Sequence, residues 1–221
     1  MDPRFNINKR DTKTYIYFRP NENNDLDDIK LLLENDDTFD VSKDDNAYKN
    51  VEDIISRYVT NPRRLCNGIT PDYVKESLKK VDAIVIIGSQ KSNPSLNGNI
   101  FGVALINFEQ DTNSIYIDIF CSHIGTSRSG ELLLHKIEDI CRTLYIEKIH
   151  LTSVDNAIPF YGRYGFIKLD SQCDDMCEMV KYINKKIGGK RKTKKQRKTN
   201  KQRKTNRQRK TIKNFKKFIK K

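Results

Sequence analysis

The sequence predicts an α+β fold, and three features of the 221-residue chain support that class. Its N-terminal part carries apolar residues at helical spacing, its middle holds three successive strand-like segments, and a strand–helix–strand pattern follows. Helices followed by an antiparallel meander and such a unit are typical of one mixed sheet covered by helices. We therefore expect a mostly antiparallel sheet of six to seven strands flanked by helices.

The N-terminal part predicts one strand and three helices. Residues 14–18 alternate aromatic residues with Ile and Thr, which indicates a strand. Apolar stripes predict helices over 26–33 and 51–58, and the acidic, Asn-rich stretch 35–46 between them reads as a loop. Thr70 before a proline predicts the N-cap of a short third helix that ends near residue 80.

After these helices, the spacing of the apolar residues changes from helical to strand-like. Three segments rich in β-branched residues and separated by turn residues predict an antiparallel meander, over 82–88, 100–108 and 114–121. An amphipathic helix over 131–145 and a strand over 148–154 come next. A short helix over 156–164 and two further strands, over 166–169 and 176–183, complete the pattern.

Charge divides the chain into two parts. The net charge is +13, but residues 188–221 hold 18 Lys and Arg and no Asp or Glu. Residues 1–187 keep 24 basic against 29 acidic residues, a net of −5. We therefore expect a mildly acidic globular domain over 1–187 and an appended, disordered basic tail over 188–221.

The five cysteines argue against a secreted, disulfide-rich scaffold and against a metal site. An odd count without regular spacing, in a chain without an apolar leader, argues against a disulfide framework. Cys173 and Cys177 are followed by no second pair and no well-placed His, so we expect no metal. No apolar run approaches the roughly 20 residues that span a bilayer, which predicts a soluble, intracellular protein.

A loop of small residues runs from residue 121 into the amphipathic helix that ends near residue 145. The free amides and positive dipole end of a helix N-terminus favour anions such as a pyrophosphate. Gly- and Ser-rich loops also occur as plain turns, so the loop by itself leaves both interpretations open.

Ala157, Phe160, Tyr161, Gly165 and Phe166 follow that loop after a helix and a strand. Their spacing resembles the motif Ala-x-x-Phe-Tyr-x-x-x-Gly-Phe of the GNAT (GCN5-related) N-acetyltransferase superfamily. The resemblance is specific over 100–169, and the element order agrees from residue 14 onward. The family's loop usually reads Gln/Arg-x-x-Gly-x-Gly/Ala, whereas this chain has Gly125 in place of Gln or Arg and Arg128 in place of Gly. Viral members have a similar Cys-Ser-then-glycine version of the loop.

This resemblance implies an N-acetyltransferase that uses acetyl-CoA as cosubstrate, without a metal, and transfers acetyl to a primary amine in a ternary complex. It implies splayed central strands with the pantetheine arm between them, and one strand amide that stabilises the oxyanion. The cofactor contacts carried over are Phe120, Cys121, Ser122, Gly125, Thr126, Ser127, Arg128, Ser129, Gly130 and Asn156.

Two residues are the candidates for proton transfer. Tyr161 occupies the position of the family's general acid for the departing thiolate, and the alternative is core packing. Asp118 lies on the strand where some relatives carry the base, and the alternative is a solvent-facing residue. His123 is either a titrating loop residue or a solvated one. Asn156 is expected to cap the short helix as well as to contact the pantetheine arm.

The tail repeats a basic hexamer from residue 194 to residue 211 and contains no apolar residue there. Such a segment suits sequence-independent binding to nucleic acid, import into the nucleus or nucleolus, or packaging in a virion. Apolar residues at helical spacing over 212–219 also fit an acidic partner or membrane surface, and a solubilising role is the plain alternative. The sequence leaves two functions open: an active acetyltransferase with an unidentified protein or small-molecule acceptor, or a GNAT-fold binding module targeted to nucleic acid.

Overall fold

The structure is a computed structural model that describes residues 5–6, 12–20, 26–42, 44–59, 69–89, 100–123, 126–170, 173 and 175–183. Its helical elements are α1 (Asp27–Glu34), α2 (Asp45–Val59), α3 (Pro71–Leu78), α5 (Ser129–Leu144), the 3-10 turn η2 (Asp155–Ala157) and α6 (Ile158–Arg163). Its strands are β1 (Phe5–Asn6), β2 (Thr12–Phe18), β3 (Phe39–Val41), β4 (Ala83–Ser89), β5 (Ile100–Glu109), β6 (Ser114–Ser122), β7 (Thr126–Ser127), β8 (Lys148–Val154), β9 (Ile167–Lys168) and β10 (Met176–Tyr182).

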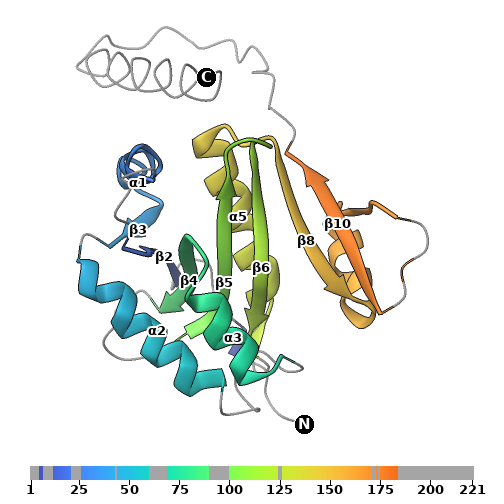
Figure 1. Cartoon of the computed structure of the whole chain (residues 1–221), viewed down its shortest axis with the longest axis horizontal. Coiled ribbons are helices and arrows are strands. Elements are labelled where there is room, and N and C mark those ends of the chain that lie inside the picture. The colour runs from blue at the N-terminus through green and yellow to red at the C-terminus, as the bar shows by residue number, and fades with distance from the viewer. Residues whose placement is uncertain are drawn as a thin grey trace, which may run out of the picture.

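Eight of these strands form one sheet in the order β3-β2-β4-β5-β6-β8-β10-β9 (Figure 1). Strands β2, β4, β5 and β6 are antiparallel in turn, as are β8, β10 and β9. The two halves meet where β6 and β8 run parallel, over only part of each strand. The expected α+β class, the mostly antiparallel sheet and the splayed central strands are confirmed. The sheet has eight strands instead of the expected six to seven, because β3 adds to its edge beside β2.

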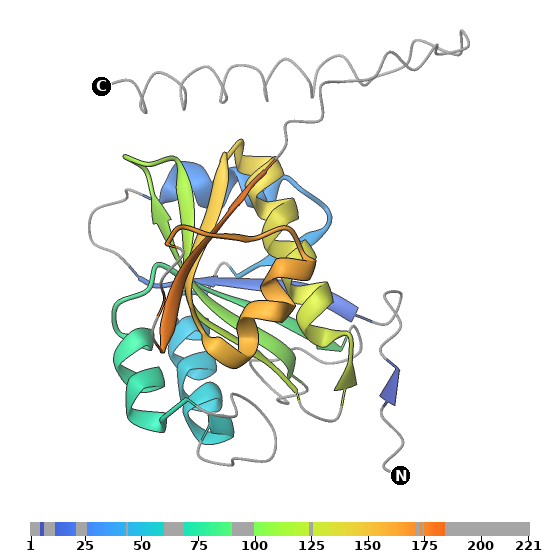
Figure 2. The same cartoon turned by 90° about the vertical axis from the view of Figure 1, so that its right-hand side faces the viewer.

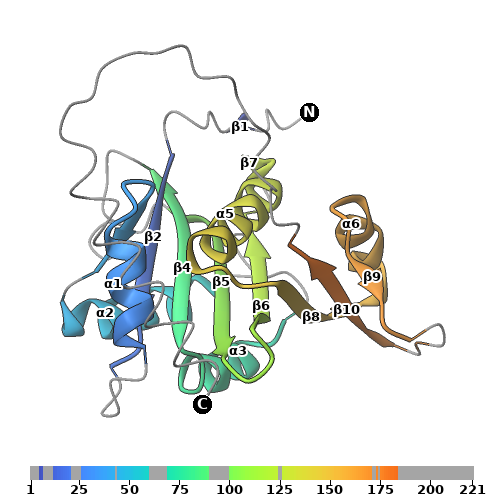
Figure 3. The ribbon, with the colours of Figure 1, turned by 90° about the horizontal axis from the view of Figure 1, so that it is seen from above.

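Helices cover the two faces of the sheet unequally. Helices α1 and α5 pack on one face, and α2 and α3 pack on the other. Figure 2 shows α6 on the same side as α5, and Figure 3 shows α3 beneath the sheet when α5 lies above it. Since α2 and α3 cover the N-terminal half, the α3 side of β8 and β10 carries exposed apolar residues such as Val154 and Met176.

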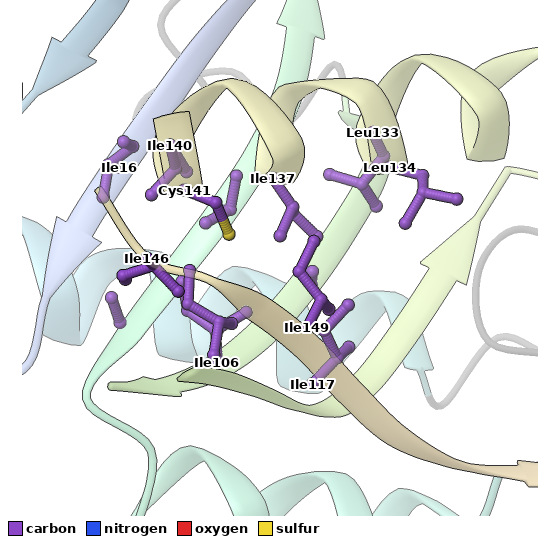
Figure 4. Packing of buried hydrophobic residues seen from close by; sticks show 14 of the residues in the cluster. Ile16, Ile106, Ile117, Leu133, Leu134, Ile137, Ile140, Cys141, Ile146 and Ile149 are labelled. Carbon is purple, nitrogen blue, oxygen red and sulfur yellow. The ribbon is translucent and has the colours of Figure 1, made fainter. Parts of the chain in front are cut away.

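The core under α5 explains why that segment is helical. Its buried residues recur every three or four positions, as in Leu133, Ile137 and Ile140, so they form one stripe toward the sheet. Figure 4 shows this stripe above Ile106 and Ile117 of the sheet. Burial of such side chains stabilises the fold by about 1.5–3 kcal/mol each.

A buried ion pair ties α5 to the C-terminal half of the sheet. Glu138 is 4% exposed and accepts hydrogen bonds from Lys181 of β10 and, at 2.8 Å, from Arg142. Burial alone raises the pKa of a carboxyl, but the hydrogen bonds from Lys181 and Arg142 hold the pKa of Glu138 below its ordinary value. This ion pair links α5 to β10, in addition to the parallel pairing that joins β6 to β8.

The Asn-rich stretch 35–46 is not the loop that its composition predicts. It contains β3, which pairs in parallel with β2 at the edge of the sheet, and it reaches the first turn of α2. Phe39 and Val41 are buried, whereas Asp40 between them is only partly buried, as the alternation of a strand requires. The carboxylate of Asp40 lies 2.7 Å from Nζ of Lys13 on β2. Whether so short a segment forms a strand depends on pairing with its neighbour rather than on its own composition. None of the described helices is both long and apolar enough to cross a membrane.

Candidate active site at the divergence of β6 and β8

Strands β6 and β8 pair only at their beginnings. Their parallel register runs from Ser114 opposite Lys148 to Ile117 opposite Leu151 and then stops. Beyond these residues the two strands separate, as the ribbons of Figure 1 show. The second half of β6 pairs with β5, and no described strand pairs with it on its β8 side. An extended ligand fits such a strand edge by adding hydrogen bonds to it.

A β-bulge lies at the point of divergence. Leu105 of β5 pairs with Ile119 while the next residue, Ile106, pairs with Ile117, so Asp118 is an extra residue on β6. Ile117 belongs to the core under α5, whereas Ile119 belongs to the core under α2 and α3. The bulge therefore reverses the alternation of side chains along β6 immediately after its last pair with β8.

Asp118 is held from the α3 side of the sheet. The hydroxyl of Tyr73 on α3 donates a hydrogen bond of 3.0 Å to Oδ1 of Asp118. Helix α3 begins as the sequence predicts, because the side chain of Thr70 accepts the backbone N–H of Tyr73 and a proline follows Thr70. Sequence reasoning found Asp118 but missed Tyr73, since nothing local distinguishes this tyrosine from other surface residues.

Further polar groups lie on the same side of the sheet. Nε2 of His150 is 2.7 Å from Glu109, and the His150 ring lies 5.0 Å from the ring of Tyr116. Burial raises the pKa of the Glu109 carboxyl, but hydrogen bonds from Ser114, His150 and Thr112 lower it overall. His150 is thus part of a polar network on the α3 side of the sheet.

The N-terminus of α5 lies on the opposite face. Arg128 is the N-cap and adopts a left-handed conformation with φ of 69°, while its side chain is 76% exposed. That conformation favours glycine, which accounts for the glycine that the resemblance expects at this position. Ser129 and Gly130 open the helix and are buried. The structure does not describe Gly125.

The two residues before Arg128 form strand β7. Thr126 and Ser127 pair in parallel with Phe5 and Asn6 of β1, so a segment near the N-terminus of the chain lies beside the loop. This pairing was not anticipated from the sequence. It occupies one hydrogen-bonding side of the β7 backbone.

Phe120 connects the unpaired half of β6 to both helices on the α5 face. A Cβ placed on Gly130 would lie 3.6 Å from the Phe120 ring and 3.4 Å from the ring of Phe160 on α6. Phe120 also lies 6.0 Å from the ring of Tyr161. The N-terminus of α5, the strand edge of β6 and Tyr161 therefore meet at one side chain.

Residues Cys121 and Ser122 continue the same strand. Their register partners on β5 are Val103 and Gly102. The Cys121 side chain is buried in the core under α2 and α3 and is disulfide-bonded, so only its backbone faces the strand edge. His123 follows, and its backbone N–H donates to the carbonyl of Phe101.

Tyr161 lies at the centre of an aromatic cluster. Its ring is 5.2 Å from Phe160 and 5.4 Å from Phe166, and the residue is 7% exposed. Burial raises the pKa of its hydroxyl well above the ordinary value, so the phenol is protonated at neutral pH. Among the described residues, the Tyr161 hydroxyl has no hydrogen-bond partner. The packed ring fits a role in the core, and the available hydroxyl fits a general acid, so Tyr161 is compatible with both interpretations.

The expected N-cap role of Asn156 is wrong. Asn156 lies inside η2 and is exposed, and the N-cap residue of α6 is Ala157 without a side-chain hydrogen bond. The preceding turn runs directly into α6, since the N–H of Ile158 donates to the carbonyl of Asp155. A continuous turn leaves no separate position for a capping side chain.

The remaining cysteines form no metal cluster in the part of the chain that the structure describes. Cys173 and Cys177 form a disulfide with a Cα–Cα distance of 5.2 Å, and Cys121 is also disulfide-bonded, contrary to the expectation that the cysteines form no disulfide framework. Cys141 is free and buried in the core under α5.

No model of a protein family and no curated protein matches the sequence. Solved N-acetyltransferase structures are similar to it. Tetrahymena GCN5 is 14% identical over 62% of this chain and 86% of its own, with a TM-score of 0.45. The ribosomal-protein-S18-alanine N-acetyltransferase from Escherichia coli is 14% identical over 63% and 92%, with a TM-score of 0.45. The PaiA N-acetyltransferase from Thermoplasma acidophilum, in complex with coenzyme A, is 12% identical over 62% and 93%, with a TM-score of 0.42.

Proposed function

We propose that this protein is a GNAT-type N-acetyltransferase, which transfers the acetyl group of acetyl-CoA to a primary amine in a ternary complex. The observation that carries the proposal is the divergence of β6 from β8 after Ile117 and Leu151, with the N-terminus of α5 and Tyr161 both packed against Phe120 beside it. This arrangement supplies a strand edge, an anion-binding helix end and a protonated phenol at one place.

The chain's residues fit coenzyme A without a metal. The backbone of Phe120, Cys121 and Ser122 could offer hydrogen bonds to an extended pantetheine arm, because none of the strands that the structure describes pairs with this part of β6 on its β8 side. The amides at the start of α5 suit a pyrophosphate, since the first turn of a helix leaves its N–H groups without helical partners. The residues proposed to hold it are Gly125, Thr126, Ser127, Arg128, Ser129 and Gly130, and Asn156 is proposed to contact the arm.

The reaction is a direct attack. The nitrogen of a neutral amine forms a bond to the acetyl carbon while the carbon–sulfur bond breaks. A backbone N–H of β6 stabilises the negative charge that develops on the carbonyl oxygen. Tyr161 gives its proton to the departing thiolate, and Asp118 accepts the proton that the amine loses.

The two sides of the sheet support this division of roles. Tyr161 belongs to the core on the α5 face, whereas Asp118 is bonded to α3 on the other face. An acetyl group placed between the diverging strands would therefore have a proton donor on one side and a proton acceptor on the other. The amine would approach from the α3 side.

The second candidate function is a GNAT-fold binding module without turnover, which the tail delivers to nucleic acid. The left-handed conformation of Arg128 favours it, because a side chain stands where the resemblance expects glycine. In both cases we propose residues 1–187 as the domain and 188–221 as the basic tail, which lies outside the described residues. The same tail underlies the proposed nuclear, nucleolar or virion location.

Two measurements on the full-length protein separate these functions. Calorimetry with acetyl-CoA and with coenzyme A tests binding, and mass spectrometry after incubation with acetyl-CoA and a panel of amines tests turnover. The panel should contain protein N-termini, lysine peptides, polyamines and small amines. Binding with acetylation of at least one amine supports the enzyme, binding without acetylation supports the module, and no binding refutes the enzyme.

A further inference from the structure

We propose that Tyr73 is a positioning residue that holds the carboxylate of Asp118 toward the incoming amine. The inference rests on the proposed function, because it assigns a role to a neighbour of the proposed base. Tyr73 lies on α3, far from Asp118 in the sequence, and no feature of the resemblance points to it.

The hydrogen bond between these residues is directional. The Tyr73 hydroxyl donates to Oδ1 of Asp118 at 3.0 Å. A carboxylate has further lone pairs, so Oδ2 is left to accept a proton from a substrate. Among the described residues, no other group forms a hydrogen bond with the Asp118 side chain.

The position of Tyr73 is determined by its helix. Val74 and Leu78 anchor α3 in the core, while Thr70 caps its N-terminus. Tyr73 is 50% exposed, and its hydroxyl reaches Asp118 on β6. A rigid helix with a capped end holds a side chain more tightly than a loop would.

The bulge explains why Asp118 needs such a partner. Asp118 is the unpaired extra residue of β6, and the last pair with β8 precedes it. Its neighbours Ile117 and Ile119 are anchored in opposite cores, whereas its own side chain is only partly buried. The hydroxyl of Tyr73 therefore selects one orientation from those open to a carboxylate at a strand irregularity.

The hydroxyl is suited to donate. Burial and the hydrogen bond to Asp118 raise the pKa of Tyr73, so it keeps its proton at neutral pH. Tyr116 of β6 lies near enough to raise the pKa of Tyr73 further, and it is followed on this side by His150 of β8 and Glu109 of β5. His150 and Glu109 lie 2.7 Å apart and are engaged with each other.

The test is the pH profile of kcat/KM for Tyr73→Phe, measured with acetyl-CoA and an amine that the wild-type protein acetylates. Loss of the donor leaves the Asp118 carboxylate free to adopt other orientations, so kcat/KM should fall across the profile. One hydrogen bond to a charged group corresponds to about a tenfold loss of kcat/KM. KM for acetyl-CoA should not change.

Two matched variants control the result. Tyr182→Phe removes a hydroxyl from another exposed tyrosine, on β10, and should leave the profile unchanged. Asp118→Asn should lower kcat, and adding Tyr73→Phe to it should have no further effect, because the two residues act as one unit. Urea unfolding of each variant checks that stability is retained.

The inference is overturned if Tyr73→Phe and the wild-type protein have the same profile, or if the effects of Tyr73→Phe and Asp118→Asn simply add. It is also overturned if Asp118→Asn is fully active. These outcomes leave the acetyltransferase function intact. If the wild-type protein acetylates no amine, the proposed function itself fails and the role of Tyr73 fails with it.

Discussion

Ile117 and Ile119 lie two residues apart on one strand, yet their side chains pack in cores on opposite faces of the sheet. In a regular strand such residues share a face. Asp118, the extra residue between them, shifts the alternation by one position. Because the shift coincides with the last pair of β6 and β8, one irregularity sets both the location of the Asp118 carboxylate and the direction of Phe120.

Gly130→Val should abolish binding of coenzyme A. A Cβ at this position would touch the rings of Phe160 and Phe120, so the extra methyl groups would displace the start of α5. Overpacking of this kind costs about 1–3 kcal/mol and should leave the protein folded. Gly162→Val in α6 is the control, since its Cβ would enter open space. Calorimetry and circular dichroism give the answer, and unchanged affinity in Gly130→Val would place the pyrophosphate elsewhere.

Arg128→Gly should raise the free energy of unfolding. The left-handed conformation costs a non-glycine residue about 1–2 kcal/mol, of which the greater freedom of glycine in the unfolded chain cancels a part. The net gain should be about 0.5–1 kcal/mol in urea unfolding. Arg128→Ala keeps the strain and should give no gain. Weaker coenzyme A binding in both variants would mean that the guanidinium, rather than the loop backbone, contacts the ligand.

Tyr161→Phe should lower kcat by roughly 10²–10⁴-fold, the usual size of general acid catalysis, with little change in KM for acetyl-CoA. Stability should be retained because the ring packing is preserved and the described residues offer the hydroxyl no hydrogen bond. Tyr145→Phe, at an exposed tyrosine, serves as the control. Turnover equal to that of the wild-type protein at every pH would assign Tyr161 to packing.

Glu138→Gln should change how stability depends on pH. The pKa of Glu138 is lower in the folded protein than in the unfolded chain, so its stabilisation is present above the unfolded value of about 4.3. It is lost as the pH falls through the folded value. The variant should lose about 3 kcal/mol at pH 7, because it leaves Lys181 without its partner, and should approach the wild-type protein at low pH.

The matched control is Asp139→Asn. Asp139 also pairs with Arg142, at 2.7 Å, but its side chain is 44% exposed. Exposed pairs contribute about 0–1 kcal/mol, so this variant should follow the wild-type curve. Urea unfolding between about pH 3 and pH 7 covers the window of the carboxyl. A constant gap between Glu138→Gln and wild type would contradict the linkage.

Deletion of residues 188–221 should remove nucleic-acid binding and leave acetyl-CoA binding unchanged. The tail carries 18 positive charges, whereas residues 1–187 carry a net of −5 and are repelled by phosphates. Each neutralised duplex phosphate contributes about −0.9 to the log–log salt slope. Two labelled duplexes of unrelated sequence should be titrated at several salt concentrations. Equal binding by the truncated protein, or a strong preference for one duplex, would exclude the tail as the electrostatic anchor.

Local chemistry was sufficient to predict most elements of the sheet and its helices. Thr70 caps α3 as expected, because a threonine before proline satisfies an N-terminal amide whatever surrounds it. The three strands β4, β5 and β6 form the expected meander, since strands that follow one another in the sequence are usually neighbours in a sheet. The sequence by itself also shows that residues 1–187 are mildly acidic and residues 188–221 strongly basic, because charge is a property of composition.

Tertiary structure decided the features on which the proposed chemistry depends. The insertion of β10 between β8 and β9, the short parallel contact of β6 with β8, and strand β3 all come from pairing between distant segments. The bulge at Asp118 and its bond to Tyr73 arise in the same way, from one strand held between two cores and a helix packed on one of them. Such contacts exist only in the folded protein, because packing and hydrogen bonding between distant segments override the preferences of each residue.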